Sequence, residues 1–226
     1  MNYLSIVNAL REKCGASGAA LTTVTGLSGE SLKFCNWVND AWMDIQGMAE
    51  NWEFMRVSFS FNTVAQQQAY TPAQANAVNF GNWKTDSFRL YQTALGPANE
   101  VWLPCREYGY FRNLYQFGAM RVAYQRPVEW AASPAKAILL GATPNAAGYT
   151  VTGEYYLAPQ ELQAATDVPS LPTEYHRAII YRAMMFYGGH EAASEVFQLG
   201  QSEFDKLLAR LELNQLPPVR FAEPLL

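Results

Sequence analysis

The stretch AWMDIQGMAENWEFMRVSFSF, residues 41–61, begins with the pattern of a helix and ends with the pattern of a strand. Its first half continues an apolar face whose members recur at spacings of three and four, the period of an amphipathic helix: Leu32, Cys35, Val38, Ala41, Trp42, Ile45 and Met48. From Arg56 onward, Val57, Phe59 and Phe61 alternate with polar residues, as in a half-buried strand. Neither glycine nor proline separates the two patterns, so the sequence predicts a rigid joint with Trp52 and Phe54 wedged into it.

Both ends of the chain are expected to be helical. Residues 2–13 carry an apolar face and precede a loop of small and polar residues. Near the C-terminus, Pro172 suits the first turn of a helix for which Ser170 is the candidate cap. A buried face follows, made of Ala178, Ile179, Ala183, Met184 and Tyr187. A further helix is expected over residues 191–211.

The middle of the chain favours β-structure. Short β-like segments follow the first strand at residues 87–93, 100–105, 120–126, 136–141 and 149–158, and the loop 142–148 has the composition of a hairpin turn. Residues 105–116 suggest one or two helical turns. Several short strands at close spacing are typical of a small antiparallel sandwich or barrel.

The expected fold is therefore α+β, with a discontinuous helical bundle built from the N- and C-terminal segments. Residues 1–54 and 158–213 form the two parts of this bundle, and residues 55–157 form an inserted antiparallel β-sandwich or barrel lobe. Residues 214–226, NQLPPVRFAEPLL, contain three prolines and no helical spacing, so we expect an extended C-terminal arm. Trp52 and Phe54 lie at the expected joint between the two lobes.

Composition narrows the class of protein. Half of the 226 residues are apolar and only 16% are charged, which indicates large buried surfaces, some of them buried only in an assembly. A net charge of −4 argues against a non-specific nucleic-acid binder. No apolar run approaches the roughly 20 residues of a membrane span, and no signal-peptide pattern begins the sequence. Three widely spaced cysteines fit reduced thiols in a cytosolic setting.

Candidate chemistry is sparse. The segment GGHEAAS, residues 188–194, lacks the second histidine of a zinc-protease helix, because Ser194 stands at that position. His176 lies one helix earlier, and His190 fits better as a residue near the start of a helix after the Gly-Gly break. Neither a nucleophile elbow nor a phosphate-binding loop occurs. The sequence thus predicts no catalytic residue, no metal and no cofactor.

Three surfaces are candidates for binding. Four arginines interleave with aromatic residues in the middle of the chain: Arg106, Arg112, Arg121 and Arg126, with Tyr108, Tyr110, Phe111 and Tyr124. They could contact nucleic acid or an acidic partner. The more common arrangement is that surface arginines pack along aromatic side chains of the β lobe. Trp83, Trp102 and Trp130 suggest the alternative of a small-ligand or carbohydrate-binding module, or an enzyme, with its site in the β lobe. The arm is a candidate for docking onto a neighbouring subunit or another protein, which would bury its apolar side chains. The docking residues would be Pro217, Pro218, Val219, Arg220, Phe221, Leu225 and Leu226.

Two blocks of the chain resemble the head-to-tail adaptor proteins of phages, which include connector, neck and tail tubular protein A-like proteins. These blocks are LKFCNWVNDAWMDIQGMAENWEFMRVSFSFNT, residues 32–63, and LPTEYHRAIIYRAMMFYGGHEAASEVFQLGQSEFDKLLARL, residues 171–211. The shared features are a helix ending in AW-DIQ and W-F-R, a β lobe, LP-EYH, and a last helix with F-LL--L.

The resemblance implies a structural virion protein without enzymatic activity. It would form a ring, commonly of twelve subunits, beneath the portal and extend the DNA channel to the tail. Its partners would be the portal ring, tail or nozzle proteins and other copies of the chain, and DNA would pass without sequence-specific binding. No membrane is involved. The arm would reach the portal, and the protein would lie in the virion neck after assembly in the host cytoplasm.

Overall fold

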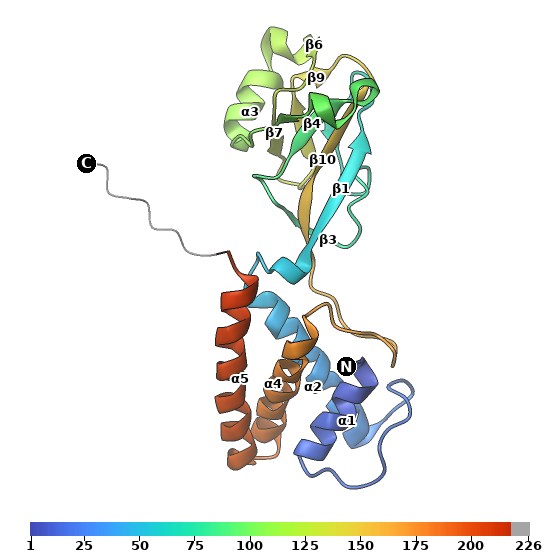
Figure 1. Ribbon diagram of the computed structural model, residues 1–226, viewed down its shortest axis with the longest axis vertical. Helices are drawn as coiled ribbons and strands as arrows, with labels where there is room; N and C mark the ends of the chain where they lie inside the picture. Colours follow the sequence, from blue (N-terminus) through green and yellow to red (C-terminus); the bar gives the residue numbers. More distant parts are fainter. Residues whose placement is uncertain (218–226) are drawn as a thin grey trace, which may run out of the picture. The chain divides into compact units, whose positions relative to one another are not determined.

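The computed structural model describes residues 1–217 and has an α+β fold, as predicted (Figure 1). The chain divides into two compact units. One, the helical unit, combines Met1–Phe54 with the chain from Pro159 onward, and the other, the β unit, comprises Met55–Ala158. The N-terminal and C-terminal segments of the sequence therefore share one unit.

The helical unit contains α1 (Tyr3–Lys13), α2 (Gly29–Gly47), α4 (His176–His190) and α5 (Ser194–Gln215). Helix α4 packs against all three of the others. It can do so because it is apolar on most sides, with Ala178, Ile179, Ile180, Ala183 and Met184 all buried. A helix that is apolar all round lies inside its unit. A 3-10 turn (Thr173–Tyr175) precedes α4, and another (Glu53–Met55) follows α2.

Two glycines let α4 and α5 approach closely. A Cβ added at Gly200 of α5 would lie 2.8 Å from the Tyr181 carbonyl oxygen of α4. A Cβ added at Gly188 of α4 would lie 2.8 Å from both the backbone nitrogen and the Cβ of Phe197 in α5. Glycine destabilises the interior of a helix. Its presence at these two contacts indicates that close packing of the helices outweighs the low helix propensity of glycine.

The β unit is built on one long antiparallel pair. Strand β1 (Arg56–Asn62) pairs with β10 (Tyr149–Leu157) in a continuous register from Arg56↔Tyr156 to Asn62↔Thr150. On the other side of β10 lie β3 (Phe80–Trp83) and β4 (Arg89–Gln92), and β5 (Val101–Trp102) pairs with β4 at the edge. A second antiparallel sheet has the order β2 (Ala69–Tyr70), β8 (Ile138–Gly141) and β7 (Glu129–Ala132), while β6 (Tyr124–Gln125) and β9 (Thr143–Pro144) form a short parallel pair.

Aromatic side chains fill the core of the β unit. Residues from both antiparallel sheets belong to this core, and the rings of Phe88 and Trp130 stack with centroids 3.7 Å apart. The second sheet is buried on both faces. Trp130 and Leu140 face the main core, whereas Ala131 and Leu139 pack against Phe111 and Tyr115 of α3 (Tyr108–Tyr115).

Several elements differ from the sequence predictions. The predicted hairpin at 142–148 is wrong, because β8 and β10 belong to different sheets and β9 lies between them. Residues 118–122 form a 3-10 turn, so the strand expected at 120–126 is reduced to β6. Strands β2, β3, β7 and β9 were not predicted. Helix α2 ends at Gly47, and α4 starts at His176 after the 3-10 turn, which Ser170 does not cap. Helix α5 continues to Gln215, so the first two residues of the expected arm are helical.

Candidate interaction surfaces

The two expected joint residues pack onto the end of α2. Trp52 is fully buried, and its indole Nε1 donates a hydrogen bond of 2.9 Å to the Ile45 carbonyl. The ring of Phe54 stacks on Trp52 at 5.5 Å and lies 6.0 Å from Trp42. These contacts fix the path of the chain as it leaves α2. The role of Trp52 and Phe54 as a joint between lobes stays a prediction.

Two amide side chains of α2 hold the segment that returns from the β unit. Asn39 donates to the Leu162 carbonyl and accepts from the Leu162 backbone N–H, both at 3.0 Å. Gln46 binds the backbone of Gln160 in the same two-sided way, at 3.1 and 3.0 Å. Because residues seven apart share a helix face, this amide clamp fixes an irregular segment over two turns. Its sequence signal is weak, since an isolated amide on a helix is commonly solvated.

His176 is a buried histidine whose two ring nitrogens both have hydrogen-bond partners. Its Nε2 lies 2.9 Å from the Leu171 carbonyl oxygen, which only accepts, so Nε2 carries a proton. Nδ1 then accepts from the amino group of Met1 at 2.7 Å. Burial is the main cause that lowers the pKa of His176 below its usual value. The neutral ring therefore ties the start of α4 to the N-terminal end of the chain.

The acidic residues of α2 fall into two environments. Asp44 accepts two hydrogen bonds from Arg182 of α4, at 2.8 and 3.1 Å. Asp40 is more exposed, and partial desolvation together with the carboxylates of Asp44 and Glu161 raises its pKa. Only Asp44 is therefore part of the packing between helices, while Asp40 and Glu161 leave negative charge on the surface.

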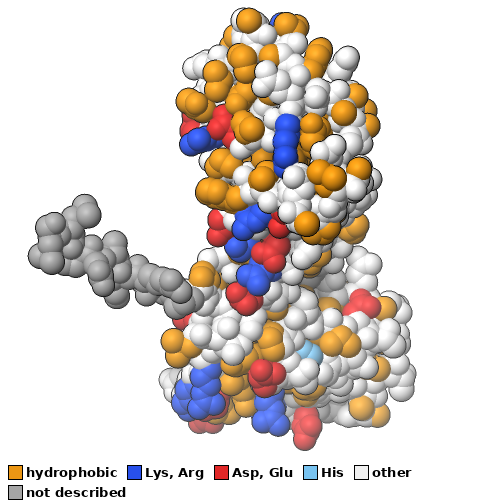
Figure 2. Space-filling view, turned by 45° about the horizontal axis from the view of Figure 1, so that its top comes forward, with side chains coloured by type: hydrophobic (Ala, Val, Ile, Leu, Met, Phe, Trp, Pro, Cys, Tyr) orange, Lys and Arg blue, Asp and Glu red, His pale blue; other side chains and the backbone are white. Residues whose placement is uncertain are grey.

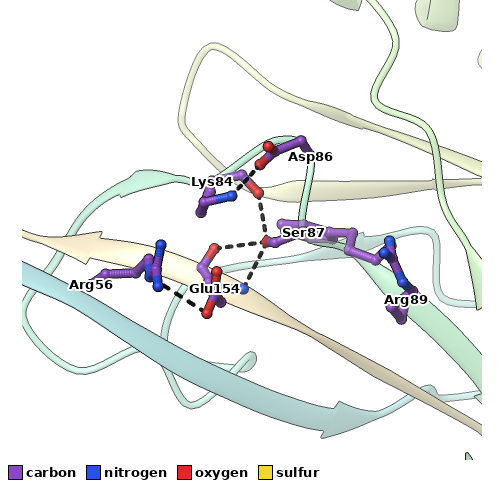
Figure 3. Close-up of polar contacts among 7 residues, drawn as sticks. Arg56, Lys84, Asp86, Ser87, Arg89 and Glu154 are labelled. Carbon is purple, nitrogen blue, oxygen red and sulfur yellow. Dashed lines mark hydrogen bonds and ion pairs between the residues drawn. The ribbon is translucent and has the colours of Figure 1, made fainter. Parts of the chain in front are cut away.

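A charged cluster lies on β1, β10 and the turn that precedes β4 (Figure 3). Arg56 pairs with Glu154 at 3.6 Å, and Lys84 pairs with Asp86 at 2.6 Å. The Ser87 hydroxyl donates to the Lys84 carbonyl at 2.7 Å and accepts from the Glu154 backbone N–H at 2.9 Å. Its proton is thus directed to a carbonyl rather than to a general base, and the arrangement fixes the turn against β10 instead of activating a nucleophile.

The three tryptophans proposed as a sugar platform do not share a surface. Trp83 and Trp130 are buried in the core of the β unit, and Trp83 donates a 2.7 Å hydrogen bond to the Lys136 carbonyl. Only Trp102, on the edge strand β5, is exposed. A stacking site needs several accessible aromatic faces, so this interpretation of the tryptophans is wrong.

The four candidate arginines have different partners. Arg106 pairs with Glu129 at 2.6 Å, and Arg112 lies over the ring of Phe117 at 5.2 Å. Arg126 donates to the Asn99 carbonyl at 3.2 Å. Within residues 1–217, none of Arg112, Arg121 and Arg126 forms an ion pair with a carboxylate. Of the aromatic residues named with them, Phe111 is buried, while Tyr110 and Tyr124 are exposed.

The other candidates are placed as follows. His190 ends α4 instead of starting a helix, and it contacts Glu191 at 2.8 Å. Within residues 1–217, no group of three or more His, Cys, Asp and Glu side chains is arranged to hold a metal ion. No helix in the same range is long and apolar enough to cross a membrane. Pro217 is the last described residue. Pro218, Val219, Arg220, Phe221, Leu225 and Leu226 lie outside the described residues.

The two units carry opposite net charge. Between residues 55 and 158 there are eight Lys and Arg against five Asp and Glu, a net charge of +3. The rest of the sequence has eight against fifteen, a net charge of −7, and the two values sum to the −4 of the whole chain. Figure 2 shows hydrophobic side chains gathered over the β unit. Such a surface is more typical of protein contacts than of an enzyme cleft.

The family model described as SU10 adaptor protein matches residues 1–221, and the chain belongs to this family of phage head-to-tail adaptors. Comparison with curated proteins gave no match. The resemblance seen in the two sequence blocks is thereby confirmed and extends over almost the whole chain. The protein is a structural component of the phage virion, of the class that interacts with portal and tail proteins.

Proposed function

We propose that copies of this chain form a closed ring of twelve beneath the portal, and that the ring extends the DNA channel toward the tail. The observation that carries the proposal is the match to the adaptor family over residues 1–221. Two features support it: the opposite charges of the two units and the exposed apolar side chains of the β unit. A head-to-tail contact that closes on itself produces a ring, and each copy then buries surface that is exposed in the monomer.

The joint and the arm have separate parts in this proposal. Trp52 and Phe54 would hold the exit from α2 in one geometry, so that every subunit presents the same surfaces to its neighbours. The C-terminal arm, expected over residues 214–226 with its first two residues prolonging α5, would dock onto the portal or a neighbouring subunit through Val219, Phe221, Leu225 and Leu226. DNA would pass through the ring without base-specific contacts, and assembly would take place in the host cytoplasm.

The proposal is tested by mixing the purified chain with its portal and imaging the product by negative-stain electron microscopy. We expect rings seated on one face of the portal, with twelve copies by native mass spectrometry. A chain that stays monomeric and unbound in every mixture would contradict the proposal.

The arm is tested in the same assay by deleting residues 218–226. The deletion leaves α5 intact, because α5 ends at Gln215. A matched variant keeps the length of the arm and replaces its four large apolar residues by serine. We expect both variants to lose binding to the portal, and unchanged binding would remove the arm from the proposal.

A further inference from the structure

Exposed apolar side chains occur on two linked segments of the β unit. We define the β5–β6 patch as Val101, Trp102, Tyr124 and Val128, whose exposed fractions are 41%, 55%, 43% and 60%. Its two chain segments are held together by the hydrogen bond from Arg126 to the Asn99 carbonyl. The bridge between Cys105 and Trp130 joins the same two segments further along. The two segments are therefore tied to each other in the folded β unit, although β5 and β6 belong to different sheets.

Basic residues border this patch. Arg126 lies within its second segment, and Arg121 immediately precedes that segment in the 3-10 turn Gly118–Val122. Arg121 is exposed. Val122, beside it, is 67% exposed. The second segment thus carries exposed apolar side chains with two arginines, Arg121 and Arg126, next to them along the chain.

The composition of the patch favours a protein partner over nucleic acid. Tryptophan, tyrosine and arginine are enriched in protein interfaces, whereas lysine is depleted, and residues 100–130 contain four arginines and no lysine. Burial of exposed valines against an apolar surface is favourable, whereas their contact with phosphates provides no such stabilisation. A partner with both apolar and acidic side chains would satisfy the two parts of the patch together.

The helical unit of this chain has that chemistry. Its net charge is −7, and Asp40, Glu161, Glu195 and Asp205 are among its exposed carboxylates. It also exposes apolar side chains, including Met48 at 41%, Val168 at 62% and Leu199 at 54%. Contact between two β units would bring like charges together, whereas contact between unlike units brings opposite charges together.

We propose that the β5–β6 patch binds the helical unit of a neighbouring copy and forms the head-to-tail contact of the ring. The inference rests on the proposed function, because it names the surfaces that close the proposed ring. Apolar burial at Trp102 and the valines supplies attraction, and the arginines align the patch with the carboxylates of the neighbour. A contact between two different surfaces is the kind that closed rings require.

The first test identifies the partner of Trp102 directly. Trp102 is replaced by the photoreactive residue benzoylphenylalanine, which keeps an aromatic side chain at this exposed position. Rings are assembled on the portal from a mixture of ¹⁴N and ¹⁵N chains and irradiated, and the cross-linked peptides are sequenced by mass spectrometry. We expect mixed-isotope peptides that join residue 102 to residues 1–54 or 159–217. The same replacement at Val78, an exposed position in the β unit outside the patch, should not give these peptides.

Each other outcome of this test is informative. Cross-links to the β unit of another copy, to the portal, to a tail protein or to DNA would overturn the inference while leaving the ring in place. Rings that do not form with the unmodified chain would remove the proposed function and this inference together.

The second test reverses charge at the border of the patch. Arg121→Glu changes an exposed side chain, and we expect it to raise the concentration for half-maximal ring formation about tenfold at low salt. The effect should shrink at high salt, because salt screens exposed charges. Arg177→Glu makes the same change on the acidic unit, where Arg177 is exposed, and should not weaken assembly. Circular dichroism and melting curves show whether each variant is folded. Folded Arg121→Glu that assembles like the parent chain would overturn the inference.

Discussion

At the residue scale, two buried tryptophans of the β unit differ in how their indole nitrogens are satisfied. Trp83 and Trp130 are both buried in the β unit, yet only Trp83 has a hydrogen-bond partner for its indole nitrogen. Within the described chain, the Nε1 atom of Trp130 has none. Its ring stacks on Phe88 instead. A buried donor without a partner costs about 1–3 kcal/mol, so Trp130 contributes by packing alone.

This difference predicts the order of two matched substitutions. Trp83→Phe removes a hydrogen bond and leaves the Lys136 carbonyl without its indole donor, while Trp130→Phe removes an unpaired donor. We expect Trp83→Phe to lower the free energy of unfolding by about 1 kcal/mol more than Trp130→Phe. Urea denaturation of both variants measures the difference, and equal or reversed losses would contradict the assignment.

His176 predicts how stability depends on pH. Its pKa is lowered in the folded state, so the unfolded chain binds this proton more readily and protonation favours unfolding. The stabilising contribution is complete above a pH of about 6.5 and decreases as the pH falls below that value. We expect His176→Gln to flatten the fall in unfolding free energy between about pH 7 and 5. His190→Gln, which removes the exposed histidine, is the control and should keep the slope.

At the scale of elements, packing between helices depends on where side chains are absent. Gly188 and Gly200 lie at the closest contacts of α4 and α5, whereas a Cβ at Gly189 would meet no atom within 4 Å. The three glycines therefore allow a controlled comparison within one pair of helices.

Gly188→Ala and Gly200→Ala should each destabilise the helical unit, because the added methyl must displace backbone atoms. We expect losses of about 1–3 kcal/mol, as for other overpacked contacts. Gly189→Ala should instead be neutral or stabilise by up to about 1 kcal/mol through helix propensity. Thermal and urea unfolding check the sign. Destabilisation by all three would mean that the close contact is not the cause.

The amide clamp makes a second prediction for the elements. Asn39→Ala and Gln46→Ala each leave a backbone N–H and a carbonyl of the return segment unpaired. We expect each substitution to cost about 2 kcal/mol and to speed hydrogen exchange in residues 159–167. Asn36→Ala, at an exposed position of the same helix, is the control. Unchanged exchange in Asn39→Ala and Gln46→Ala would show that the segment is held in another way.

The sequence predicts those elements whose residues have one buried face. Helices α1 and α2 and strands β1 and β10 have clear periods, and their positions were predicted closely. Strand β7 is buried on both faces, so it has no alternation to detect. Strand β9 pairs in parallel with β6, a partner that no local turn signal reveals. The roles of Asn39 and Gln46 depend on a segment more than a hundred residues away, which spacing along the chain does not show.

At the scale of the whole molecule, the two units differ in net charge. A net charge of +3 on the β unit and −7 on the remainder gives each copy two unlike surfaces. In the proposed ring, this difference would favour contacts between unlike units over contacts between like units. The family supplies the class, a phage adaptor, and the charge distribution suggests how its copies meet.

In the proposed function, the chain is present as one ring of adaptor subunits in each virion. Quantitative mass spectrometry of purified virions, with isotope-labelled peptides of this chain and of the portal, measures their copy numbers directly. We expect one copy of this chain for each portal subunit, with twelve of each. Absence from the virion, a single copy, or the hundreds of copies expected of a capsid or tail-tube protein would contradict it.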